Sequence, residues 1–184
     1  MVIMLFGVTN VGKTVTGKRL AEKLGYSFFD LDDEIKKRFQ MTLEIFIKEN
    51  PYPYERGKIK GEILKDLISK NKNNMVIAVS PIYYARHFNK LIDLEQVIAI
   101  ELQDSEVNIF ERLVFSDEND NVYEDDEYKE AHRDYYIKDI HEDIVLSKRL
   151  FKKIKNKYLI NNRPVEKVVD DLILMIQQIP SVNE

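Results

Sequence analysis

Eight residues near the start of the chain, Gly7–Thr14, have the types and spacing that suit binding of a polyphosphate. Their sequence, GVTNVGKT, satisfies the P-loop pattern G-x-x-x-x-G-K-[ST]. Glycines in such a loop allow a tight turn that points backbone N–H groups at phosphate oxygens, and the helix that follows adds partial positive charge. Lys13 would reach the β- and γ-phosphates, and the Thr14 hydroxyl would hold Mg²⁺. The nucleotide-binding residues expected from this loop are Gly7, Thr9, Asn10, Val11, Gly12, Lys13, Thr14 and Val15, with Lys13 also catalytic.

A second group of residues that could do chemistry is a cluster of carboxylates. It lies in Phe29-Asp30-Leu31-Asp32-Asp33, at the end of a predicted strand. Ligands of open α/β sheets bind beyond the carboxyl ends of the strands, so these carboxylates would lie beside the P-loop. One could hold Mg²⁺, and another could accept a proton from an acceptor hydroxyl. A simpler interpretation also fits, because Asp30 could cap the next helix.

The elements that must position these groups alternate along the chain. Short apolar runs rich in β-branched residues predict five strands, and apolar residues at helical spacing predict helices between them. An alternation of this kind is typical of an α/β fold whose parallel sheet is covered on both faces. The predicted strands are Val2–Phe6, Ser27–Phe29, Met75–Val79, Val97–Leu102 and Tyr158–Ile160. The predicted helices are Lys13–Leu24, Asp30–Phe39, Thr42–Lys48, Lys58–Lys70, a long one along Ile137–Ile154 and a last one opened by Pro164.

Composition narrows the class of protein. The 184 residues fit one domain, and 44% hydrophobic residues are ample for a core. A net charge of −4 gives no general attraction for nucleic acid or membrane surfaces. The absence of cysteine excludes disulfides and thiolate catalysis, and the opening apolar run VIMLF is too short for a signal peptide or a membrane span. We therefore expect a cytoplasmic monomer whose partners are small molecules.

One segment departs from the pattern: Ser116–Tyr128 carries seven acidic residues and no basic residue. Such a run is typical of a solvated loop, and a specific binding surface is the other interpretation.

From Val2 to about Leu67 the chain resembles shikimate kinase. The resemblance rests on the P-loop, on TGKRLAEKLGYSFFDLDDEI at residues 16–35, and on TLEIF at 42–46. It implies a three-layer P-loop kinase fold with a five-stranded parallel sheet, residues 1–184 as one domain, and a lid-like insertion at about 114–139. It also implies transfer of the ATP γ-phosphate to the 3-hydroxyl of shikimate, with Mg²⁺.

The resemblance assigns roles to further residues by their position. Thr14 and Asp30 would lie at the metal, and Asp32 would bind the acceptor and serve as the candidate base. Arg56 would bind the carboxylate of the acceptor, and Ser80 stands where the family lines the acceptor site. Arg112, Arg163 and Pro164 would line the adenine.

The departures from the family pattern fall on the acceptor side. Ser80-Pro81-Ile82 replaces three consecutive glycines, and the acidic segment replaces a lid with an arginine. The arginine of the helix after the lid aligns with Ser147, although Lys148 and Arg149 are adjacent.

Three alternatives to shikimate phosphorylation therefore remain. The chain could be a kinase for another hydroxylated small molecule, a nucleotide-binding regulatory protein without turnover, or a nucleotide-gated interaction protein. These departures also lead us to expect weak or absent activity on shikimate, with ATP still bound. Either the acids face solvent and Arg133, Lys148 or Arg149 closes the site, or the lid meets a cationic acceptor.

Overall fold

The centre of the molecule is a five-stranded parallel sheet, which the computed structural model describes together with the rest of residues 1–179. The strand order is β2 (Ser27–Asp30), β3 (Met75–Ala78), β1 (Val2–Phe6), β4 (Val97–Gln103) and β7 (Asn156–Leu159). The central strand β1 is buried along its whole length, which explains why its sequence VIMLF is uninterrupted rather than alternating. The predicted α/β class and five-stranded parallel sheet are thus confirmed.

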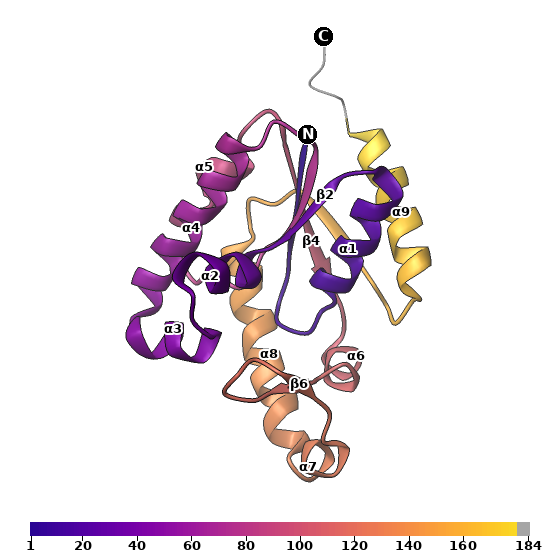
Figure 1. Ribbon diagram of the computed structural model, residues 1–184. Helices are drawn as coiled ribbons and strands as arrows, with labels where there is room; N and C mark the ends of the chain where they lie inside the picture. The colour runs from indigo at the N-terminus through magenta and orange to yellow at the C-terminus, as the bar shows by residue number, and fades with distance from the viewer. Residues whose placement is uncertain (180–184) are drawn as a thin grey trace.

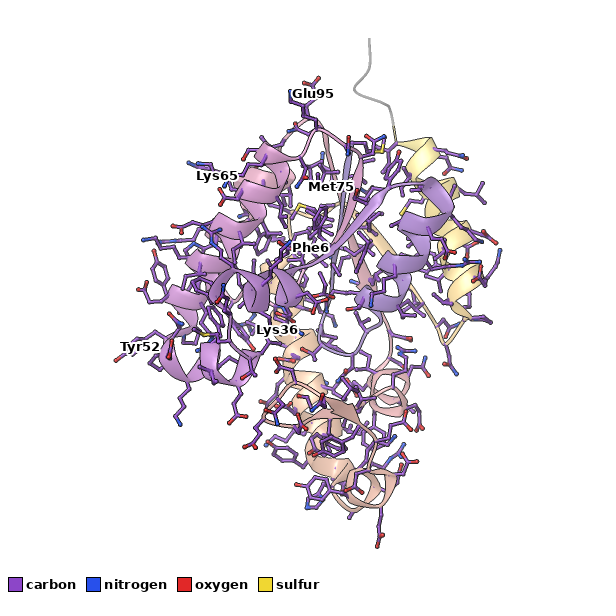
Figure 2. All side chains as sticks on the ribbon, in the orientation of Figure 1. Phe6, Lys36, Tyr52, Lys65, Met75 and Glu95 are labelled. Atoms are coloured by element: carbon purple, nitrogen blue, oxygen red, sulfur yellow. The ribbon has the colours of Figure 1, made fainter. Side chains whose placement is uncertain are left out.

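Helices cover both faces of this sheet (Figure 1). One face packs against α1 (Lys13–Leu24), α6 (Glu106–Glu111) and α9 (Val165–Gln178). The other packs against α2 (Leu31–Phe39), α3 (Leu43–Glu49), α4 (Pro53–Lys70), the short helices η1 (Ala85–His87) and α5 (Asn89–Ile92), and the end of α8 (Arg133–Leu150). Phe6 and Met75 lie in the interior between these layers, whereas Lys65 of α4 and Glu95 project from the surface (Figure 2).

Local signals fix the helices that approach the carboxyl ends of the strands. Helix α1 begins after Gly12 and ends at Gly25, and both glycines have a left-handed backbone. The Asp30 carboxylate caps α2 by accepting a hydrogen bond from the Asp32 N–H, and Thr42 caps α3 in the same manner. Helix α4 starts at Pro53, a favoured first residue, and so begins five residues before the prediction.

The acidic segment is folded rather than being a plain loop. Strands β5 (Phe115–Ser116) and β6 (Val122–Tyr123) form an antiparallel hairpin, followed by α7 (Asp126–Ala131). The hairpin and α7 lie beyond the carboxyl ends of the sheet strands, beside α8 (Figure 1). Most acidic side chains of the segment are exposed, but the Asp120 carboxylate accepts a 2.9 Å hydrogen bond from the Leu43 N–H at the start of α3. The hairpin therefore touches the part of the chain that leads to α4.

Within residues 1–179, no helix is both long and apolar enough to cross a membrane.

Candidate active site

The P-loop turns as its glycines allow. Gly7 has φ of 146° and Gly12 has φ of 106°, which are backbone conformations that other residues rarely adopt. A Cβ at Gly7 would lie only 2.6 Å from the Leu102 carbonyl oxygen, so β4 also excludes any side chain there. Glycine at position 7 is thus required both by backbone conformation and by packing.

Lys13 lies against its own loop. The Nζ atom donates hydrogen bonds to the carbonyl oxygens of Gly7 (3.0 Å) and Val8 (2.8 Å). Burial lowers the pKa of Lys13 to about 8, although the nearby carboxylates of Asp32 and Asp30 oppose the change. A polyphosphate beside this ammonium would stabilise its charged form.

The side-chain oxygens of Thr14 and Asp30 are in contact. The Thr14 hydroxyl donates a 2.7 Å hydrogen bond to Asp30 Oδ2, while Asp30 Oδ1 accepts from the Asp32 N–H. Burial raises the pKa of Asp30, with Asp32 adding to the effect and the Thr14 hydrogen bond opposing it. A hydroxyl and a carboxylate in contact fit Mg²⁺, which binds one or two protein oxygens and takes its other ligands from phosphate and water. Residues 1–179 contain no cluster of three or more His, Cys, Asp or Glu side chains that could hold a metal ion.

Asp32 and Ser80 form the other side of the site. Asp32 Oδ1 lies 3.8 Å from Lys60 Nζ, and Lys60 donates a 3.1 Å hydrogen bond to the Pro81 carbonyl oxygen. Ser80 is only 5% exposed, and its hydroxyl has no hydrogen-bond partner among the described residues. A buried hydroxyl without a hydrogen bond is costly, so the Ser80 hydroxyl would be stabilised by a partner that reaches it.

A single cavity of about 390 Å³ joins these groups. It extends from the P-loop and the Thr14–Asp30 pair to Asp32 and the segment after β3, where Ser80 and Pro81 lie. The lining residues from the P-loop are Thr9, Asn10, Gly12, Lys13, Thr14 and Val15. A phosphate donor on the loop and an acceptor beside Asp32 would therefore share one space.

Arg112 lines the P-loop end of the cavity, and hydrogen bonds to neighbouring residues fix the position of its side chain. Its guanidinium donates to Asp104 Oδ2 at 2.6 Å and to the Asn10 carbonyl oxygen at 3.4 Å. The Asp104 side chain is fully buried. Burial alone would raise the pKa of Asp104, but hydrogen bonds from Asn108, Arg112 and the Ser105 N–H outweigh it and lower the pKa. Arg112 is therefore a fixed cation at the P-loop end of the cavity.

Several predicted site residues do not line this cavity. Val11 is fully buried in the core, which leaves only its backbone to meet phosphate. Arg56 donates to the carbonyl oxygens of Asn50 and Pro51. Arg163 pairs with Asp171 and lies over the Tyr158 ring, and Pro164 precedes α9.

The basic residues expected to close the site lie elsewhere. Arg133 stacks on Phe110 and pairs with Glu130, while Lys148 and Arg149 are exposed on α8. Ser147 is buried and donates to the Ile144 carbonyl oxygen. The half-buried Asp143 of α8 instead lines a small pocket together with Tyr83 and the P-loop residues Gly7 and Val8.

Sequence reasoning missed Lys60 and Asp104. Lys60 lies one helical turn after Arg56 on α4, so the i, i+4 spacing of two cations was the available signal. Asp104 follows β4 directly, at the edge of the sheet where ligands bind.

The sheet order, the P-loop after β1 and the cavity at the carboxyl ends of the strands define a P-loop kinase fold. The model of the shikimate kinase family matches residues 9–176. The chain belongs to the shikimate kinase family.

Individual relatives agree with this assignment. A shikimate kinase of Azobacteroides pseudotrichonymphae is 40% identical over 75 residues, which are 40% of this chain and 43% of that protein. A shikimate kinase of Thermodesulfovibrio yellowstonii is 35% identical over 112 residues, 60% of this chain and 62% of that protein. The aligned segments thus span less than two thirds of each of these relatives.

Solved structures extend the likeness in fold along the chain. A shikimate kinase of Acinetobacter baumannii, solved in complex with shikimate, has a TM-score of 0.74 and 18% identity. The match covers 96% of this chain and 92% of that one, and at this identity it concerns the fold alone.

Proposed function

We propose that the protein transfers the γ-phosphate of ATP to the 3-hydroxyl of shikimate. The observation that carries the proposal is the single cavity that joins Lys13 and Thr14 to Asp32 and Ser80. Family membership and the shikimate kinases among its relatives support the same acceptor.

Each residue has a chemical task in this proposal. Asp32 accepts the proton of the acceptor hydroxyl, whose oxygen forms a bond to the γ-phosphorus as the bond to the ADP oxygen breaks. Lys13 and Arg112 bind phosphate oxygens, on which charge accumulates during transfer. Arg112 is thus reassigned from the adenine to the phosphates, because it contacts the Asn10 carbonyl oxygen of the P-loop. Arg163 and Pro164 flank the adenine in this proposal, and Arg56 meets the acceptor carboxylate after it leaves its two backbone partners.

Mg²⁺, held by Thr14 and Asp30 together with the nucleotide, would neutralise phosphate charge in the bound state. The contact between the Thr14 hydroxyl and the Asp30 carboxylate supports this assignment.

The expectation of weak activity on shikimate rested on lost glycines and a lost lid arginine. Lys60 adds a cation on the acceptor side that this expectation did not include. We therefore expect shikimate turnover with a KM in the ordinary range of roughly 1 μM–1 mM.

The test is ADP release from ATP and Mg²⁺ with shikimate, with a panel of polyols and cyclic hydroxy acids, and with no acceptor. The proposal requires release that depends on shikimate. Release that depends on another acceptor, or nucleotide binding without turnover, would replace it with one of the alternatives given above.

A further inference from the structure

Two cations lie on neighbouring turns of α4, and the ammonium of one of them, Lys60, lies beside Asp32 and Pro81, two residues that line the cavity. Arg56 and Lys60 are four residues apart, so they occupy the same face of the helix. Like charges at this spacing destabilise a helix, and the Lys60 side chain is only 14% exposed. Burial lowers the pKa of Lys60, Arg56 adds to the effect, and Asp32 and Asp30 oppose it. A buried cation beside another cation is costly for the free protein, and an anionic ligand would relieve that cost.

Lys60 keeps capacity to bind such a ligand. Its ammonium has three N–H donors, and one is used by the Pro81 carbonyl oxygen at 3.1 Å. Asp32 Oδ1 at 3.8 Å lies beyond hydrogen-bond distance, so this pair does not occupy a second donor.

Ser80 provides an independent observation at the same place. Its hydroxyl is buried without a partner among the described residues, and Ser80 lines the cavity next to Pro81, the residue that Lys60 contacts. A buried, unsatisfied hydroxyl and a cation with free donors thus lie next to one end of the cavity, beside its lining residues Asp32 and Pro81. Together they suit a carboxylate, which accepts hydrogen bonds at both oxygens.

We infer that Lys60 binds the carboxylate of the acceptor, with the Ser80 hydroxyl as a second donor, and thereby selects anionic acceptors. This inference rests on the proposed function for the identity of the acceptor. It gives this chain a substitute for the backbone N–H groups that the family's glycines expose and that Pro81 lacks.

The test removes the positive charge of Lys60 in one arm and the negative charge of the ligand carboxylate in the other. Binding of shikimate and of its neutral methyl ester is measured by calorimetry on protein loaded with ADP and Mg²⁺, so that no turnover is needed. The variants are Lys60→Met and Lys60→Arg, and the matched control is Lys65→Met, which removes an exposed lysine from the same helix.

Lys60→Met is expected to weaken shikimate binding roughly 10- to 100-fold, the usual effect of losing a hydrogen bond between charged groups. It should change binding of the ester less than about 3-fold, Lys60→Arg should recover part of the loss, and Lys65→Met should change neither ligand. The thermal unfolding midpoint of Lys60→Met should stay level or rise, because a buried cation is removed.

A purely structural role for Lys60 would give the opposite pattern. The unfolding midpoint would then fall and both ligands would lose affinity equally, which overturns the inference. If the wild type turns over shikimate and Lys60→Met leaves the KM for shikimate unchanged, the inference about Lys60 is overturned and the proposed function stands. Charge-selective binding through Lys60 without phosphate transfer supports the inference and removes the proposed function. Failure of the wild type to bind shikimate overturns both.

Discussion

The Thr14 hydroxyl donates a 2.7 Å hydrogen bond to the Asp30 carboxylate, although β1, which leads to the P-loop, and β2, which ends at Asp30, are separated in the sheet by β3. The contact closes the gap between the P-loop helix and the second strand. It places two oxygen ligands of the kind that Mg²⁺ prefers at the edge of the cavity.

Asp30→Asn should therefore raise the Mg²⁺ concentration needed for half-maximal turnover by roughly 10-fold or more, because a charged ligand to the cation is lost. The measurement is a Mg²⁺ titration of ADP release at saturating ATP. Asp33→Asn is the matched control, since Asp33 pairs with Lys36 at the surface. Equal Mg²⁺ dependence in both variants would remove Asp30 from the metal site.

Lys13→Met should reduce kcat roughly 10²-fold or more, because a preorganised cation on the transferring phosphate is lost. It should also weaken ADP binding, measured by calorimetry. Lys18→Met changes an exposed lysine on the same helix and should leave both quantities near wild type. A Lys13→Met variant with wild-type ADP affinity would contradict the nucleotide site.

Binding of ADP should take up a proton above pH 8. Burial lowers the pKa of Lys13 in the free protein to about 8; Asp32, Asp30 and Asp143 oppose this and Lys60 adds to it. Bound phosphate raises the pKa of Lys13 again, so ADP affinity falls as the pH rises above about 8.

The stability of the free protein changes with pH in the opposite direction. The unfolded lysine holds its proton more tightly, so burial of this charge destabilises the free protein below pH 8, and the cost disappears as the pH rises toward 10.5.

The proton uptake can be measured by calorimetry of ADP binding at pH 9 in two buffers of different ionisation enthalpy. The apparent enthalpies should differ for the wild type and agree for Lys13→Met. Equal enthalpies in the wild type would show that Lys13 is already charged at this pH.

Asp104→Asn should raise the KM for ATP roughly 3- to 30-fold with a smaller change in kcat, because Arg112 loses the charged partner that holds it over the P-loop. Steady-state kinetics in ATP gives both constants. Asp93→Asn, which removes an exposed carboxylate paired with Lys153, serves as the control. An unchanged KM would mean that Arg112 does not contact the nucleotide.

The sequence was informative where local signals determine the structure. The ends of α1 were predicted correctly because the P-loop fixes its start and Gly25 its end. Helix α4 was predicted too short, since its first turn depends on Pro53 rather than on apolar spacing. The long helix was extended to Ile154 because Phe151 and Ile154 continue its apolar stripe, but both residues pack on the core after the helix has ended.

The acceptor side of the site was less predictable because tertiary contacts create it. A lysine in a helix is usually exposed, and only the packing of α4 on the segment after β3 places Lys60 against Pro81. Likewise, nothing near Ser80 in the chain shows that its hydroxyl would be buried without a partner. Lys148 and Arg149 were candidates to close the site, but both are exposed on α8, and Asp143 of the same helix lies beside Gly7 and Val8 of the P-loop.

Asp32→Asn should abolish phosphate transfer and leave ADP affinity nearly unchanged, because Asp32 lines the cavity outside the P-loop and is assigned in the proposed function to the acceptor hydroxyl. Asp33→Asn should retain both. Loss of ADP binding in Asp32→Asn would place Asp32 at the metal instead and remove the division of roles between Asp30 and Asp32.

The most direct test of the central claim is to identify the product. Wild-type protein is incubated with ATP, Mg²⁺ and shikimate, and ADP and phosphorylated shikimate are quantified together by mass spectrometry, with ³¹P NMR to locate the phosphate. The account predicts one shikimate 3-phosphate for each ADP and none with Asp32→Asn. ADP formed with free phosphate, or with shikimate left unmodified, would contradict it.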